Sequence, residues 1–266
     1  MRLPVCILLV LLCALGCEKT TGGLRVTFRA AAAGPDDAPP GEFINARGYH
    51  VVLNRAVLYI GALYLNQTTS GATVGLRHGC YASGTYAAQV LGGLNVDLLS
   101  PALQFFPVEG EGTSTRALAA EVWLNGSGRV DQIDDQTVIL DIAGVAERGS
   151  NRFPFAGTLT IAQNRVIPPQ IASTPGVNPI CKQRIIAPIP IDITPANGGL
   201  LVLRVDAYDL FAATDFAQLN KVSDTPLLYR FSNKVDNTAD QNVYGNMRTP
   251  RTYQFEWQSN DKTGGQ

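Results

Sequence analysis

Short stretches in which apolar and polar residues alternate recur along this chain. The first is LRVTFRA, at residues 24–30, and the last is RTYQFEWQ, at residues 251–258. Side chains point alternately to the two faces of a strand, so Tyr253, Phe255 and Trp257 are expected to share one face. A period of two residues is typical of half-buried β-strands. The pattern therefore predicts a β-rich protein.

The longest apolar segment beyond the N-terminal region is YHVVLNRAVLYIGALYLN, residues 49–66. β-Branched and aromatic residues are frequent in it, which favours strands over a helix. We expect two strands that bend near Gly61, and a single helix is the alternative. Further strands are expected at residues 94–99, 103–108, 118–124, 137–147, 153–162, 182–193 and 200–208.

One amphipathic helix is expected, over residues 208–220. Its apolar residues Leu210, Phe211, Phe216 and Leu219 fall near one stripe of a helical surface. A single helix among many strands does not support an α/β fold, because such a fold needs helices that alternate regularly with strands.

Roughly ten short strands and one short helix predict an all-β fold, an antiparallel β-sandwich. The 26 Gly and 16 Pro, with only 16% charged residues, agree with short strands joined by turns. We expect a single domain over residues 24–266. The segment 166–179, which is rich in proline, is the one place for a long loop or a domain boundary.

The charges of the chain nearly balance. It has 21 Lys and Arg against 22 Asp and Glu, a formal net charge of −1. A protein that follows a nucleic-acid backbone needs a basic surface. The composition therefore excludes nucleic acid as the expected partner.

The N-terminus predicts an export signal. Arg2 is followed by an uncharged, mostly aliphatic run from Leu3 to Gly16. This run is shorter than the about 20 residues that a membrane-spanning helix needs. A cation, an apolar core and small residues at its end are typical of a secretory signal peptide.

The end of this run, ALGC at residues 14–17, resembles the lipobox of bacterial lipoproteins, although Ala14 stands where that family usually has Leu. The resemblance implies that residues 1–16 are removed, that Cys17 is lipidated, and that residues 17–23 form a tether. Such lipid anchoring makes the membrane a partner through the N-terminus. Glu18, in place of an Asp, implies the outer membrane. An ordinary cleavable signal with an incidental Cys17 is the alternative.

Two of the five cysteines remain once residues 1–16 are removed and Cys17 is lipidated, and these are Cys80 and Cys181. In an oxidising compartment two such thiols are expected to form a disulfide. A metal site is the alternative, because His78 lies two residues before Cys80 and shares its face on a strand. With Cys181 and His50, these residues would give a four-ligand site for copper or zinc.

Two carboxylates, Glu109 and Glu111, lie close together in the acidic stretch VEGEGTSTR. On one face they would suit acid–base chemistry on a glycan, or a Ca²⁺ ion. Asp131 and Asp206 are further acidic candidates, and solvated turns are the alternative. The chain has no G-x-S-x-G, no H-E-x-x-H and no P-loop lysine. No catalytic residue is assigned on this basis.

Three segments, VVLNRAVLYIGALYL, FPFAGTLTI and GGLLVLRVDAYDLF, occur in an order that resembles the copper-binding periplasmic proteins associated with methanobactin receptors. That resemblance implies copper but carries over no ligand residue. The strand order is also similar to that of uncharacterised envelope β-sandwich lipoproteins. We therefore expect a lipid-anchored binding or accessory module of the cell envelope, without catalysis or cofactor, that contacts an envelope protein. Copper or zinc binding and glycan hydrolysis are the alternatives.

Overall fold

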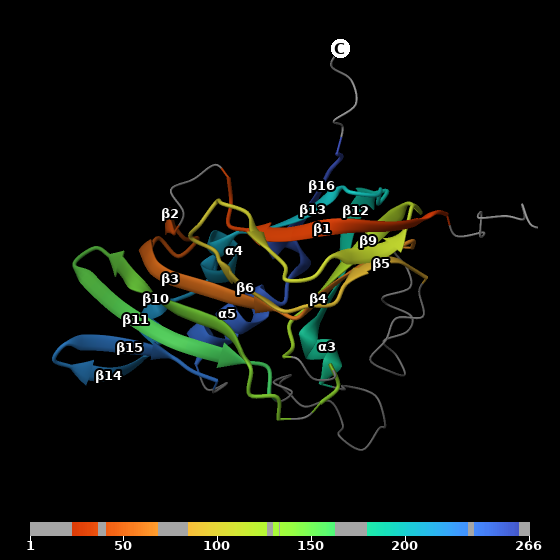
Figure 1. Cartoon of the computed structure of the whole chain (residues 1–266). Coiled ribbons are helices and arrows are strands. Elements are labelled where there is room, and N and C mark those ends of the chain that lie inside the picture. The colour runs from red at the N-terminus through yellow and green to blue at the C-terminus, as the bar shows by residue number, and fades with distance from the viewer. Residues whose placement is uncertain are drawn as a thin grey trace, which may run out of the picture.

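The computed structural model describes residues 23–36, 41–68, 85–126, 130–132, 134–162, 180–233 and 237–260, and these residues form two β-sheets (Figure 1). The larger sheet has nine strands, in the order β12-β9-β4-β5-β8-β1-β13-β16, with β7 also paired to β1. Its strands are β1 (Arg25–Ala33), β4 (Ala62–Asn66), β5 (Tyr86–Val90), β7 (Gln104–Phe105), β8 (Gly110–Thr113), β9 (Ala117–Trp123), β12 (Ile185–Ile193), β13 (Leu200–Val205) and β16 (Tyr253–Gln258).

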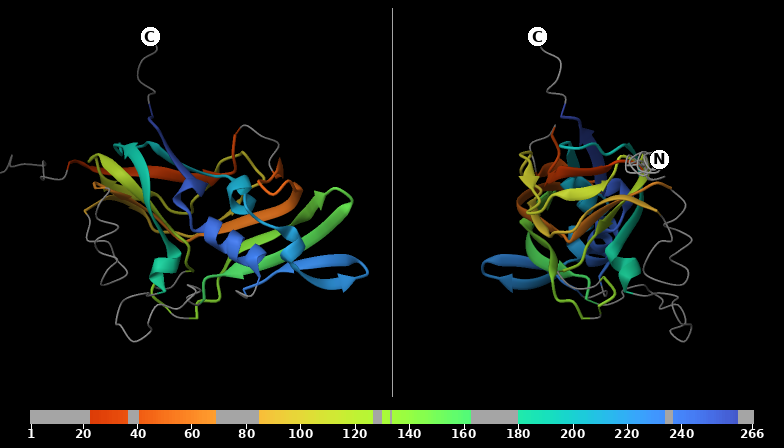
Figure 2. Two further views of the ribbon diagram at one scale, coloured as in Figure 1. Left: turned by 180° about the vertical axis from the view of Figure 1, so that it is seen from behind. Right: turned by 45° about the vertical axis from the view of Figure 1, so that its right-hand side comes forward.

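The smaller sheet has seven strands, in the order β14-β15-β11-β10-β3-β2, with β6 also paired to β3. Its strands are β2 (Glu42–Ile44), β3 (His50–Ile60), β6 (Leu94–Asp97), β10 (Val138–Arg148), β11 (Asn151–Thr160), β14 (Asn220–Asp224) and β15 (Leu227–Phe231). The β14–β15 hairpin projects from one end of the molecule, and β1 begins at the other end (Figures 1 and 2).

The prediction of a mostly β protein is confirmed, but an antiparallel sandwich of about ten strands is too simple. Both sheets are mixed, because β1 pairs with β13 in parallel and β11 pairs with β15 in parallel. The first and last strands of the larger sheet, β12 and β16, contact each other, so this sheet nearly closes on itself. Alternation in a sequence identifies a strand but not the strand that pairs with it. The two parallel pairs could not be predicted, because neither joins strands that are consecutive in the sequence.

The predicted bend at Gly61 is confirmed, and it is the point where the chain passes from one sheet to the other. β3 ends at Ile60 in the smaller sheet and β4 begins at Ala62 in the larger one. A Cβ atom at Gly61 would lie 2.3 Å from the backbone oxygen of Asn125. Because no side chain fits this approach, glycine is required here.

The main apolar core lies between the sheets and includes residues of α4 (Ala207–Phe211) and α5 (Thr238–Met247). Its centre is an aromatic group of Phe155, Phe211, Phe216 and Phe231, whose ring centroids lie 5.0–6.1 Å apart. Such offset and edge-to-face contacts add to the stabilisation from burial. The predicted single domain over residues 24–266 stays a prediction, since its suggested boundary at 166–179 lies outside the described residues.

The single helix predicted at residues 208–220 is in fact two short helices, α4 and the 3₁₀ helix η2 (Phe216–Gln218). Each begins at its own aspartate cap, where Asp206 accepts from the backbone N–H of Tyr208 and Asp215 from that of Ala217. An Asp that caps a helix start satisfies backbone donors that the helix itself leaves free. The second cap therefore starts a new helix where the hydrophobic stripe predicts continuation.

A longer helix, α5, begins in the polar sequence NTADQN, residues 237–242. Asn237 caps it by accepting from the backbone N–H of Asp240 at 2.7 Å. The carboxylate of Asp240 is itself buried and accepts from the Ser232 hydroxyl at 2.8 Å. Asn and Asp are common in turns and at helix starts, because in both places their side chains form hydrogen bonds with the local backbone. Here they begin a helix.

A buried arginine, Arg184, holds the short helix α3 (Cys181–Arg184) in place. The Arg184 side chain is fully buried and donates to the backbone oxygens of Ile161, Val130 and Gln132 at 2.5–3.0 Å. Its five N–H donors match several carbonyl groups at once. Two loops and Cys181 are thereby held together beside the larger sheet. Across the described ranges, none of the helices has the length and apolar character that a membrane span requires.

Candidate functional site

The stretch GEGT at residues 110–113 is a strand, β8, and not a turn. Its two glycines face the core, where a Cβ atom at Gly110 would lie 2.3 Å from the Phe28 ring. A Cβ atom at Gly112 would lie 2.3 Å from the backbone oxygen of Ala87. Only glycine fits these two positions. Because side chains alternate along a strand, Glu111 and Thr113 point the opposite way, to the outer face of the larger sheet.

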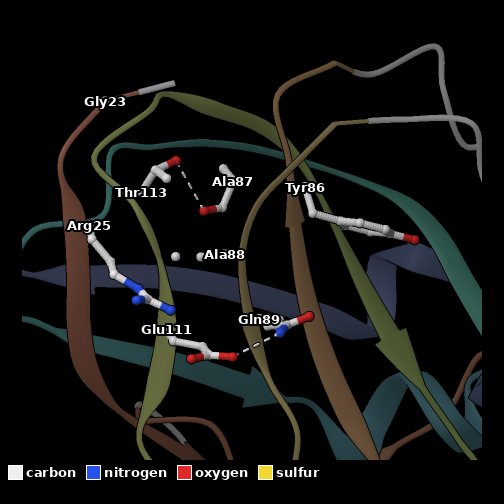
Figure 3. A pocket seen from close by; sticks show the side chains of 9 residues that line it. Gly23, Arg25, Tyr86, Ala87, Ala88, Gln89, Glu111 and Thr113 are labelled. Atoms are coloured by element: carbon white, nitrogen blue, oxygen red, sulfur yellow. Dashed lines mark hydrogen bonds between the residues drawn. The ribbon is translucent and has the colours of Figure 1, made fainter. Parts of the chain in front are cut away.

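These two side chains help to line an open hollow on the outer face of β1, β5 and β8 (Figure 3). Its volume is about 500 Å³. The lining residues are Gly23, Arg25, Tyr86, Ala87, Ala88, Gln89, Glu111, Gly112 and Thr113. Concave sites of this size that carry a few convergent polar groups are typical of small-molecule binding.

The polar groups of the hollow come from three adjacent strands. The Gln89 amide nitrogen donates to Oε1 of Glu111 at 3.1 Å, and the Thr113 hydroxyl donates to the backbone oxygen of Ala87 at 3.4 Å (Figure 3). Arg25 pairs with Thr113 across β1 and β8, and its guanidinium is directed to the same space as the Glu111 carboxylate. The hollow thus presents a cation, an anion, an amide and a hydroxyl.

A bulge in β5 shapes one border of the hollow. Leu65 pairs with Ala88 while the next residue, Asn66, pairs with Tyr86, so that Ala87 is an extra residue on β5. A β-bulge of this kind changes the direction of the strand and of the neighbouring side chain. Here it directs the backbone oxygen of Ala87 to β8, and Tyr86 extends away from the charged groups (Figure 3).

Beside the hollow, on the same face of the sheet, lies a buried carboxyl, Glu121. Its two oxygens accept from the Trp123 indole and from the Asn66 amide, each at 2.8 Å. The Tyr64 ring stacks at an angle between Trp123 and Tyr86, with centroids 4.5 and 4.8 Å away. Burial raises the pKa of the Glu121 carboxyl, and the two hydrogen bonds offset this only in part.

Glu121 was not among the site residues predicted from the sequence. A signal was present, because Glu121 is the one charged residue in the otherwise apolar stretch LAAEVWL. A charged side chain on a buried strand either has partners or is neutral. Arg25, Gln89, Tyr86 and Thr113 gave no comparable signal, since single polar residues on a strand are common.

The structure does not bring the carboxylates of β8 and β9 together. Between Glu111 and Glu121 lie the strands β4 and β5, so their backbones are roughly 14 Å apart. Glycoside hydrolysis needs carboxyl groups about 5–10 Å apart. Of the predicted pair Glu109 and Glu111, only Glu111 lines the hollow. Asp206 caps α4 and Asp131 lies in the turn at 130–132.

Of the four predicted metal ligands, the structure describes two. His50 is exposed on β3 and contacts Oε1 of Glu42 at 2.9 Å. Cys181 is fully buried at the start of α3, at the opposite end of the molecule from the start of β3 (Figure 1). Within the described part of the chain, no three His, Cys, Asp or Glu side chains are grouped as a metal site.

The remaining candidates, His78, Cys80 and the lipidation residue Cys17, lie outside the described residues. The Cys80–Cys181 disulfide and a copper or zinc site therefore stay predictions.

No family model, curated protein or solved structure matches this chain. The resemblances to lipoproteins and to copper-binding periplasmic proteins consequently stay predictions, and the case for function depends on the residues themselves.

Proposed function

We propose that this protein is a binding module of the bacterial cell envelope, anchored by lipid on Cys17. The observation that carries the proposal is the uncharged run from Leu3 to Gly16 that ends in ALGC. A run of this length suits a signal peptide better than a membrane span. With Glu18 next to Cys17, the proposed location is the outer membrane.

The hollow on β1, β5 and β8 is the proposed binding surface. It gathers four polar side chains of different chemistry at one open depression. The arrangement favours binding over catalysis, because Glu111 is the one carboxyl among the described residues that line the hollow. The protein is accordingly proposed to act as an accessory or recognition module that also contacts an envelope protein.

Lipid anchoring is tested by growing cells that express the full chain with an alkyne analogue of palmitate and then attaching a fluorophore to the alkyne. The native protein is expected to be labelled and to separate with the outer membrane on a density gradient. The Cys17→Ser variant should lose the label, because it has no thiol to acylate.

Cys13→Ser is the matched control, since Cys13 lies in the segment proposed to be removed. It should be labelled like the native protein. Labelling that persists in Cys17→Ser, or an unlabelled native protein, would contradict the proposed anchor.

A further inference from the structure

The hollow contains two opposite charges, Arg25 and Glu111, that form no ion pair with each other. Arg25 pairs with Thr113, and Thr27 pairs with Glu111, so Arg25 and Glu111 are diagonal neighbours on β1 and β8. Diagonal neighbours have Cα atoms about 7–8 Å apart, within reach of long side chains. Nevertheless, no ion pair joins Arg25 and Glu111, whereas Arg116 and Asp192 elsewhere on the surface form one at 2.6 Å.

The Glu111 carboxylate forms a hydrogen bond with Gln89 and not with Arg25. Gln89 donates to one oxygen of Glu111, while the second oxygen accepts no hydrogen bond from any residue that the structure describes. Arg25 is likewise without a hydrogen-bonded partner in the described residues. Both groups therefore keep the capacity to bind a ligand group of opposite charge.

We propose that the hollow binds a zwitterionic group, with its anionic part on Arg25 and its ammonium on Glu111. This inference rests on the proposed function of the hollow as a binding surface and names the ligand chemistry. A planar guanidinium binds a phosphate or a carboxylate through two parallel hydrogen bonds. An ammonium has three donors, and the Glu111 carboxylate and the Gln89 carbonyl oxygen supply acceptors beside each other.

The charge of the hollow favours this class of ligand over simple ions. Arg25 and Glu111 together carry no net charge, so an isolated anion or cation that binds one of them leaves the other without a counter-charge. A zwitterion satisfies both. The volume of about 500 Å³ also leaves room for a larger molecule that carries the zwitterionic group at its end.

The position of the hollow adds one source for this chemistry. Gly23, which lines it, is six residues from the proposed lipid anchor Cys17, and six residues can span at most roughly 20 Å. A phosphoethanolamine headgroup in the bilayer and a free zwitterion in solution share the same charged groups, and both are within reach of the hollow.

The test uses the full, purified chain in detergent and titrates it with O-phosphoethanolamine, monitored by calorimetry. Ethanolamine and inorganic phosphate, the two halves of the probe, are titrated separately. The zwitterion is expected to bind roughly tenfold or more tightly than either half. Equal affinity for the zwitterion and phosphate, or no heat with the zwitterion, would overturn the proposal.

Two variants locate the binding. Arg25→Gln and Glu111→Gln are each expected to weaken O-phosphoethanolamine by about tenfold or more, because each leaves one charge of the ligand without a partner. The controls are Arg29→Gln and Glu109→Gln, which change the same residue types on β1 and beside β8 but do not line the hollow. Unchanged affinity in the first two variants, or equal losses in the controls, would overturn the assignment.

Vesicles distinguish the two sources. If the ligand is a headgroup, the protein that lacks its lipid through Cys17→Ser should bind phosphatidylethanolamine vesicles and not phosphatidylglycerol vesicles. Binding of O-phosphoethanolamine alone would assign a free zwitterion. A labelled Cys17 without zwitterion binding would overturn this inference only, and zwitterion binding without labelling would overturn only the anchor.

Discussion

Glu121 shows how a single buried carboxyl couples stability to pH. The side chain is 1% exposed, and its oxygens accept hydrogen bonds from Trp123 and Asn66, whereas no cation contacts it within the described chain. Burial raises the pKa of Glu121, so the folded protein binds its proton more tightly than the unfolded chain does. This contribution to stability is fully present below the unfolded value of about 4.3 and is lost as the pH rises through the folded pKa.

We expect Glu121→Gln to remove this pH dependence. The glutamine cannot ionise, and the amide oxygen of Asn66, which lacks a donor within the described residues, can accept from it after a rotation of the Asn66 amide. Urea unfolding followed by circular dichroism should give free energies within about 1 kcal/mol of the native protein at pH 4. At pH 8 the variant should be the more stable of the two.

Glu256→Gln serves as the comparison, since Glu256 is exposed on β16. Its free energy of unfolding should follow that of the native protein at every pH. Parallel curves for Glu121→Gln and the native protein would show that folding does not raise the pKa of Glu121.

The elements differ in how far the sequence predicts them. The long strands β3, β10 and β11 follow from their apolar alternation, and the bend at Gly61 follows from the glycine. β8 could not be predicted in this way, because its inner positions are glycines that leave space for Phe28 and Ala88 from other strands. The hollow could not be predicted either, because its residues come together only through the pairing of β1, β5 and β8.

Substitutions of two glycines test whether the space around each one decides its effect on stability. Gly112→Ala is expected to destabilise the protein by about 1–3 kcal/mol, because the new Cβ would lie 2.3 Å from the Ala87 oxygen. Gly245→Ala should instead stabilise it by about 0.5–1 kcal/mol, because Gly245 is exposed in α5 and nothing lies within 4 Å. Thermal unfolding of both variants measures the two effects, and a change of the same sign in both would contradict the account.

At the scale of the whole molecule, the sequence predicts β content but not the order of the strands. Arg29 on β1 pairs with Leu200 on β13, and Phe155 on β11 pairs with Tyr229 on β15. Such long-range parallel pairs leave no mark in local alternation, because the pattern of each strand depends only on which face is buried. The nearly closed larger sheet is a consequence of this pairing, and for that reason a simple sandwich was expected.

The predicted Cys80–Cys181 disulfide would also join distant parts of the chain, because it would close a loop of about 100 residues. On the chain-entropy model it would raise the free energy of unfolding by about 4–5 kcal/mol. Thiol titration of the lipidated protein, unfolded without reductant, is expected to detect no free thiol. Two thiols should appear after reduction, with a lower unfolding temperature. Two free thiols before reduction, together with stoichiometric copper or zinc, would favour the metal site instead.

The place of β1 within the larger sheet bears on when the chain can fold. β1 lies between β8 and β13, and β13 is followed by β16 at the far end of the sequence. During synthesis β1 therefore has no second neighbour until residues 200–205 have been made, and contacts so distant in sequence form slowly. Under the proposed export through the bacterial inner membrane, the larger sheet would therefore be completed only after β13 had crossed.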